Sequence, residues 1–125
     1  MHSLIGTWTL VEARAFDKHG NELAPPLGPN PMGVIQYDAQ RMIVAVCDGR
    51  SEMPTGAAPR TYLSYTGSYQ FDGELLVTHV DGASSPDGFA DQVRHLTFPT
   101  ADRYVAAPAN GVLGTGLKIT WDRVR

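Results

Sequence analysis

The chain contains little cysteine, no long apolar run and no cluster of positive charge. A single cysteine, Cys47, cannot form an internal disulfide, and its apolar neighbours at 43–46 favour a packed strand residue over a nucleophile. No apolar stretch is long enough for a membrane-spanning helix, and the first residues lack the basic and apolar regions of a signal peptide. The 10 basic residues are outnumbered by 13 acidic ones and form no run. We therefore expect a cytoplasmic protein that binds neither nucleic acid nor membrane.

Spacings that would bind a metal or a phosphate are also missing. No two of the four histidines lie two or four residues apart, and there is no cysteine cluster, so we expect no metal site. The glycine-rich segment 111–116 leads into a strand pattern and not into a helix, which argues against a phosphate-binding loop. We expect no cofactor.

Turn-forming residues are abundant, with 13 glycines and nine prolines between alternating β-branched and aromatic segments. The alternation predicts one domain, 1–125, with eight strands at about 6–16, 33–38, 41–47, 61–71, 74–81, 91–98, 103–108 and 117–124. The connections alternate between long ones (17–32, 48–60, 82–90 and 109–116) and tight ones (38–41, 72–73 and 99–102). In an up-and-down meander this gathers the long loops into a mouth and the tight turns into a base. We expect an all-β, eight-stranded antiparallel up-and-down barrel that is wide enough for one small ligand.

The tight turns also predict which side chains face the interior. A two-residue turn at 72–73 would pair Phe71 with Glu74, and a similar turn at 39–40 would set the register of the strands on either side of it. Period-two alternation then places one apolar and aromatic set of side chains inside the barrel. The polar members of that set are Tyr37, Tyr65, Tyr69 and Thr78.

Several segments share their order and spacing with a known family. Gly6-Thr7-Trp8 opens the first strand, and further motifs lie at 29–37, 67–69, 78–82, 92–94 and 120–123. Together they resemble the bacterial lipocalin-like domain family of the calycin superfamily, over most of the chain. The resemblance implies an eight-stranded antiparallel barrel in which Trp8 packs at the closed end against Arg123 in a cation–π contact. Members often have His-His where this chain has Thr78-His79, and the diverse activities of the family imply no particular reaction.

Arg94 is the strongest candidate for a functional side chain. Period two places it on the inner face of its strand with Leu96, Phe98 and Gln92, toward the mouth. A guanidinium in an apolar cup needs a partner, which could be an oxygen of a ligand or the carboxylate of Glu12. Both alternatives remain open at this point.

Whether three further charged or titratable side chains face the lumen depends on the presence of a bulge in their strands. They are Glu12, Arg14 and His79. The alternation of Trp8 and Leu10 continues inward to Glu12 and Arg14, unless a bulge leaves both in solvent. The predicted register puts His79 on the polar face, whereas a bulge would bring it into the mouth as a general base beside Arg94.

Two functions fit this cup. The first is a module that binds a small hydrophobic or amphipathic ligand and meets its polar group with Arg94, Tyr65 or Glu12. The second is a cofactor-independent isomerase, cyclase, dehydratase or lyase that acts on a polyketide- or terpenoid-like substrate, with Arg94, Glu12 and His79 as catalytic residues. In either case the residues expected to contact the ligand are Arg14, Tyr37, Tyr65, Tyr69, Thr78, Gln92 and Phe98. An interaction domain filled by its own side chains is a third interpretation, and the sequence is also compatible with a homodimer.

Overall fold

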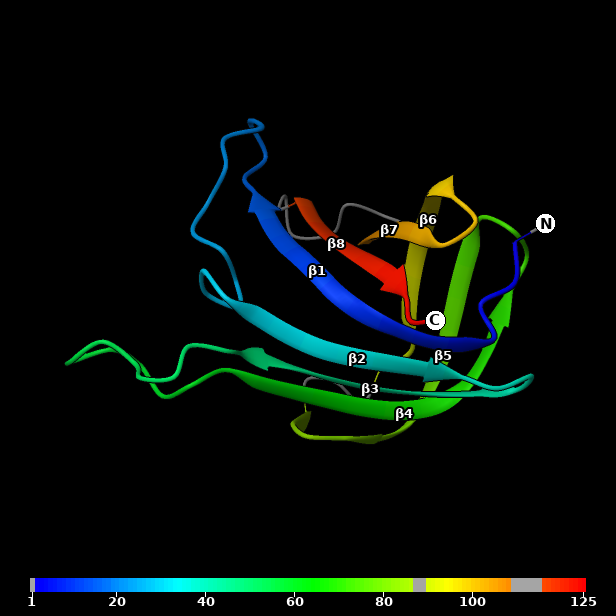
Figure 1. The fold of residues 1–125 in the computed structure, drawn as a ribbon, viewed down its shortest axis with the longest axis horizontal. Coiled ribbons are helices and arrows are strands. Elements are labelled where there is room, and N and C mark those ends of the chain that lie inside the picture. The colour runs from blue at the N-terminus through cyan, green and yellow to red at the C-terminus, as the bar shows by residue number, and fades with distance from the viewer. Residues whose placement is uncertain (1, 87–89, 109–115) are drawn as a thin grey trace.

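Eight antiparallel strands close into one barrel in the computed structural model, which describes residues 2–86, 90–108 and 116–125 (Figure 1). Each strand pairs with its neighbour in the chain, and β1 pairs with β8 to close the ring. The predicted eight-stranded up-and-down barrel is therefore confirmed. The described residues include no helix long and apolar enough to cross a membrane. The strands are β1 (Gly6–Phe16), β2 (Pro31–Tyr37), β3 (Arg41–Asp48), β4 (Tyr62–Phe71), β5 (Leu75–Ala83), β6 (Gln92–Thr100), β7 (Arg103–Pro108) and β8 (Gly116–Arg123).

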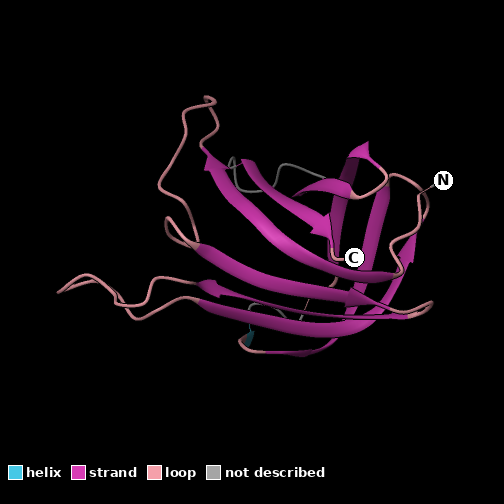
Figure 2. Ribbon diagram, in the orientation of Figure 1, coloured by secondary structure: helices cyan, strands magenta, loops and turns pink. Residues whose placement is uncertain are grey.

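The barrel has two unlike ends. Figure 2 shows long connections on the side where β1 ends and β2 begins, and short turns on the opposite side, where both chain ends also lie. The β2–β3, β4–β5 and β6–β7 connections are the short ones, as predicted. Two of the predicted mouth loops fall partly at 87–89 and 109–115, which lie outside the described residues.

The β2–β3 turn has the predicted register. Tyr37 pairs with Met42, and the backbone N–H of Asp38 donates to the carbonyl oxygen of Arg41 at 2.9 Å. The two-residue loop at 39–40 therefore aligns the inward side chains of the two strands.

The β4–β5 turn differs from the prediction by two residues. Phe71 pairs with Leu76 and not with Glu74, because the two-residue loop is Gly73-Glu74, closed by a hydrogen bond from Asp72 N–H to Leu75 O at 3.2 Å. Gly73 has a φ of 104°, a conformation that favours glycine at the first central position of such a loop. A shift of two residues preserves the alternation, so the predicted inner face of β5 is unchanged near the turn.

A β-bulge in β1 reverses the predicted direction of two charged side chains. Leu10 pairs with Trp121 and Glu12 with the next residue back along β8, so Val11 is an extra residue in β1. After this bulge Ala13 faces the core and is only 5% exposed, while Glu12 and Arg14 face solvent. The predicted inward placement of Glu12 and Arg14 is therefore wrong.

A second bulge, in β5, comes too late in the strand to turn His79 inward. Gly67 pairs with Val80 and Thr66 with Gly82, so Asp81 is the extra residue. His79 precedes this point and stays exposed on the outer face. The alternative in which a bulge brings His79 into the mouth is therefore wrong.

An aromatic core fills the base of the barrel. Trp8 is 0% exposed, packs edge-on against Tyr104 with ring centroids 4.8 Å apart, and donates from Nε1 to Leu4 O at 2.9 Å. The Arg123 guanidinium lies 4.3 Å from the centroid of the Trp8 ring and bonds the Asp102 carboxylate at 3.0 Å. The cation–π contact implied by the family resemblance is therefore confirmed.

Candidate functional site

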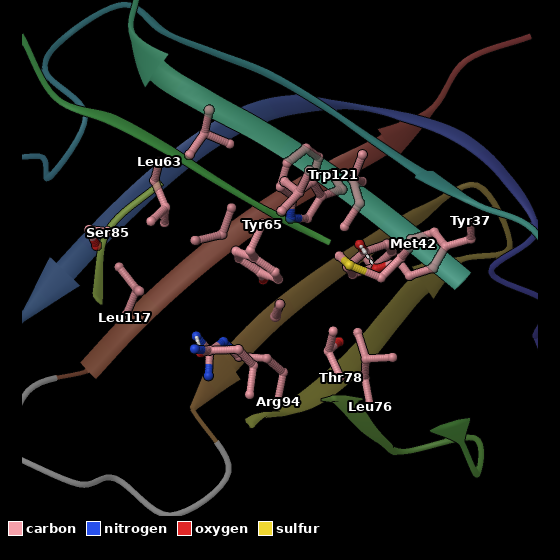
Figure 3. A pocket seen from close by; sticks show the side chains of 17 residues that line it. Tyr37, Met42, Leu63, Tyr65, Leu76, Thr78, Ser85, Arg94, Leu117 and Trp121 are labelled. Carbon is pink, nitrogen blue, oxygen red and sulfur yellow. Dashed lines mark hydrogen bonds between the residues drawn. The ribbon is translucent and has the colours of Figure 1, made fainter. Parts of the chain in front are cut away.

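An apolar cavity of about 260 Å³ lies inside the barrel, and β2 to β8 supply its wall (Figure 3). In a closed barrel every second residue of a strand faces the lumen, so each of these strands contributes alternate side chains. Most of the lining is aliphatic or aromatic, and its polar atoms come from three tyrosines, Trp121, Thr78, Ser85, Gln92 and Arg94. The lining residues are Ile35, Tyr37, Met42, Val44, Val46, Leu63, Tyr65, Leu76, Thr78, Ser85, Gln92, Arg94, Tyr104, Ala106, Leu117, Ile119 and Trp121.

Arg94 supplies the positive charge of this lining. Its Nη2 donates to Gln92 Oε1 at 2.6 Å and its Nη1 to Val93 O at 3.2 Å. No carboxylate of the described residues lies within 4 Å of the guanidinium, so the ion pair with Glu12, one of the two alternatives for Arg94, is not formed. The predicted inward placement of Arg94 is confirmed, and the other N–H donors of the half-buried group have no acceptor within the described part of the chain. Its catalytic role stays a prediction.

Tyr65 and Thr78 point into the same space as Arg94 (Figure 3). Burial raises the pKa of Tyr65, and the charge of nearby Arg94 partly opposes this rise. The Tyr65 hydroxyl is therefore a neutral donor at physiological pH. Thr78 lines the same cavity from β5 and is buried. Both hydroxyls can meet polar groups of a ligand, as the sequence predicted for their positions.

A pair of tyrosine hydroxyls lies at the deep end of the cavity. The Tyr37 and Tyr104 oxygens are 2.9 Å apart, and the two residues are only 4% and 1% exposed. Burial raises the pKa of both, so both stay protonated at physiological pH. Sequence reasoning named Tyr37 but missed Tyr104, which the alternation of β7 with the lining residue Ala106 could have identified.

Tyr69 and Phe98 pack in the base and do not line the cavity. The Tyr69 hydroxyl donates to Asp38 O at 2.6 Å, and Phe98 packs between Trp8 and Phe71 with centroids 6.5 and 6.0 Å away. The structure thus places their rings in the closed end, away from the cavity lining.

Three further predicted site residues lie on the outer surface. Glu12 is exposed, and Arg14 Nε bonds Glu22 Oε1 at 2.7 Å. His79 Nδ1 lies 2.9 Å from Asp91 Oδ2, again outside the barrel. Of the predicted site residues the cavity brings together Arg94, Tyr37, Tyr65, Thr78 and Gln92.

The lining therefore offers one cation and several neutral donors. Its described residues include no carboxylate and no imidazole, the usual general bases. The described part of the chain also contains no group of three or more metal-ligating side chains. The arrangement can hold an anionic oxygen and a neutral acceptor in an apolar enclosure.

A buried carboxylate, that of Asp48, forms contacts with two of the loops at the mouth. Asp48, which ends β3, is 4% exposed, and its Oδ1 accepts from Arg50 Nε at 3.0 Å, which lowers the pKa of the carboxyl. Arg60 donates to Asp48 O at 2.7 Å and joins the far end of the loop to the same residue. Gly28, with a φ of 72°, lies so close that an added Cβ would be 2.4 Å from Asp48 Oδ2. These contacts hold the loop that follows Asp48 at both of its ends.

Comparison with known proteins gives one family match. A family model described as a lipocalin-like domain matches residues 5–118. A solved structure of a redesigned beta barrel is 14% identical in sequence, with a TM-score of 0.47. The match covers 98% of this chain and 92% of the redesigned barrel. At that TM-score the likeness has no bearing on function. No curated protein sequence matches the chain.

Proposed function

Because the chain belongs to the lipocalin-like domain family, we propose that it binds a small hydrophobic molecule with an acidic group inside its barrel. The Arg94 guanidinium carries the proposal, since it lines an apolar cavity and, among the described residues, has Gln92 Oε1 and Val93 O as its partners and no carboxylate. A half-buried cation without a counter-charge is poorly solvated. A ligand carboxylate would accept two parallel hydrogen bonds from it, worth about 1.5–3 kcal/mol.

The size of the cavity limits the ligand. A protein cavity of about 150 Å³ accommodates one benzene molecule, so 260 Å³ has room for about ten non-hydrogen atoms. A ligand of this size corresponds to one ring with short substituents. Longer molecules would have to extend through the mouth past Arg94 and Ser85.

Binding has more support than the alternative of a cofactor-independent isomerase, cyclase, dehydratase or lyase. Such an enzyme needs a base as well as an acid beside the substrate. Glu12 and His79, two of the three predicted catalytic residues, lie outside the barrel. The described lining supplies hydroxyls, an amide, an indole N–H and Arg94, but no carboxylate or imidazole. The ionisable groups therefore favour holding an anion over moving a proton.

Calorimetric titration with para-isopropylbenzoate tests this proposal, with para-isopropylbenzamide as an uncharged compound of the same shape. We expect saturable one-to-one binding of the acid and at least tenfold weaker binding of the amide. Arg94→Met keeps the apolar stem and removes the charge, so it should weaken binding of the acid about tenfold or more.

Arg14→Met is the matched control, because it removes an equal charge from the outer surface. It should leave the affinity for the acid unchanged. Equal binding of acid and amide, or an equal response to the two substitutions, would contradict the proposal.

A further inference from the structure

The hydroxyl pair at the deep end of the cavity has one hydrogen too many. Tyr37 and Tyr104 each carry one O–H, and a single hydrogen bond joins their oxygens. Whichever hydroxyl donates in that bond, the hydrogen of the other one is left over. No described residue other than these two forms a hydrogen bond with either hydroxyl.

A buried donor without an acceptor is unfavourable, and buried polar groups are normally satisfied. Neither ring can turn its hydroxyl to solvent, because both residues are almost completely buried. The remaining direction is the cavity, which both side chains line. An acceptor atom inside the cavity would therefore satisfy the hydrogen that the pair leaves free.

The pair and Arg94 lie at different depths of the same space. Arg94 pairs with Pro108, which is four residues beyond Tyr104 along β7. Four strand residues span about 13 Å, and the Arg94 guanidinium lies toward the mouth, where it bonds Gln92 Oε1 and Val93 O. One aromatic ring with an oxygen-bearing group at each end, together with one hydrogen bond at either end, spans about this length. With its carboxylate at the mouth, the rest of such a molecule fits the room for about ten non-hydrogen atoms.

We propose that the ligand class is an amphipathic monocarboxylate that carries a second oxygen, of carbonyl or ether type, at its opposite end. The carboxylate binds Arg94 at the mouth, and the second oxygen accepts the spare hydrogen of the Tyr37–Tyr104 pair. This inference rests on the proposed function and deepens it, since it adds a second polar contact to the one that Arg94 supplies.

The test compares two acids of the same shape, para-acetylbenzoate and para-isopropylbenzoate, which differ by a ketone oxygen in place of a methyl group. The readout is the preference of the protein for the ketone, expressed as the ratio of the two Kd values. Tyr37→Phe with Tyr104→Phe removes both hydroxyls and keeps the rings. We expect the preference to fall about tenfold or more in this double variant, because the ketone then loses the donor that the tyrosine pair supplies.

Tyr69→Phe is the matched control, since its hydroxyl bonds Asp38 O outside the cavity. It should leave the preference unchanged. A preference that is the same in wild type and in the double variant overturns the inference. If para-isopropylbenzoate nevertheless binds in an Arg94-dependent way, the proposed function still stands; if neither acid binds, both fail.

A spectroscopic readout needs no variant. The carbonyl stretch of para-acetylbenzoate should shift to lower frequency on binding to the wild-type protein, relative to the same ketone group in an apolar solvent. A frequency equal to that in the apolar solvent would mean that the tyrosine pair does not reach the oxygen, and it would overturn the inference.

Discussion

The base and the mouth of the barrel are built from different kinds of contact. At the base the ring of Trp8 is enclosed by Tyr104 and Phe98, and Arg123 covers it. At the mouth the side chains that line the cavity are less buried: Leu63 is partly exposed and Arg94 is half-buried. Burial of large rings contributes most of the stability of such a core, whereas half-exposed side chains contribute little.

This difference separates stability from binding along the axis of one barrel. Trp8, Phe98 and Arg123 at the base hold the strands together and do not line the cavity. Tyr104, which packs on Trp8, is the point at which the base meets the cavity. Arg94 and Gln92 at the mouth line the cavity and are not part of the buried hydrophobic core. Substitutions at the mouth can therefore change the ligand with a small effect on folding.

The largest effect is expected from Trp8→Ala, which removes a completely buried ring from the base. It should lower the free energy of unfolding by about 3–5 kcal/mol in urea denaturation followed by circular dichroism. Tyr62→Ala is the matched control, because its ring is 69% exposed, and it should cost less than about 1 kcal/mol. Similar losses for the two substitutions would show that the base has no special role.

A rise in pH should also weaken the deep end of the barrel. Burial raises the pKa of Tyr37 and Tyr104 above the ordinary value of about 10, so the folded state holds both protons more tightly than the unfolded chain. Their contribution to stability is complete below pH 10 and is lost as the pH rises above that value. From pH 8 to pH 11 the loss is about 1.4 kcal/mol for each tyrosine, measured by urea denaturation at each pH.

The double variant Tyr37→Phe, Tyr104→Phe provides the control for this pH dependence. It keeps the two rings and has no phenol to ionise, so its stability should fall less steeply between pH 8 and pH 11. Identical slopes for wild type and double variant would mean that other groups cause the alkaline loss.

The same substitution at two arginines compares the two ends directly. Arg123→Met at the base removes hydrogen bonds to Ile5 O, Ser3 O and the Asp102 carboxylate, and should cost about 1.5–3 kcal/mol of stability. Arg94→Met should change the free energy of unfolding by less than about 1 kcal/mol while it weakens binding. A larger loss of stability at Arg94 than at Arg123 would invert the comparison.

The smallest effect is expected from Glu12→Gln. The bulge at Val11 leaves this carboxylate in solvent with no ion pair among the described residues. The free energy of unfolding should change by less than about 0.5 kcal/mol, and the affinity for para-isopropylbenzoate should stay the same. A clear loss of affinity would mean that Glu12 faces the cavity in solution.

Local patterns predict the strands and the position of Arg94, but they do not predict its contacts. Alternation and turn residues are properties of neighbouring positions, so the eight strands and the inward direction of Arg94 follow from sequence. The Val11 bulge depends on how β1 pairs with β8, more than 100 residues away, and the unbroken alternation of Glu12 and Arg14 conceals it.

The Tyr37–Tyr104 pair lies beyond sequence reasoning for a similar reason. The two residues are 67 positions apart and come from strands that are not neighbours in the barrel. Alternation can place each ring inside, but it cannot say which inward side chains meet across the lumen. The same holds for the loop contacts of Asp48, whose partners Arg50 and Arg60 look like ordinary surface charges in the sequence.

The bulge at Val11 gives β1 a position at which the chain can lose one residue without turning the following side chains to the other face of the sheet. Deletion of a strand residue normally turns every following side chain to the other face of the sheet. Deletion of Val11 would instead leave Leu10 facing inward, Glu12 outward and Ala13 inward, each opposite the same residue of β8 as before. A three-nucleotide deletion at this codon thus keeps the lumen-facing residues of β1 and its pairing with β8, so related chains can differ in length here and still build the same lumen.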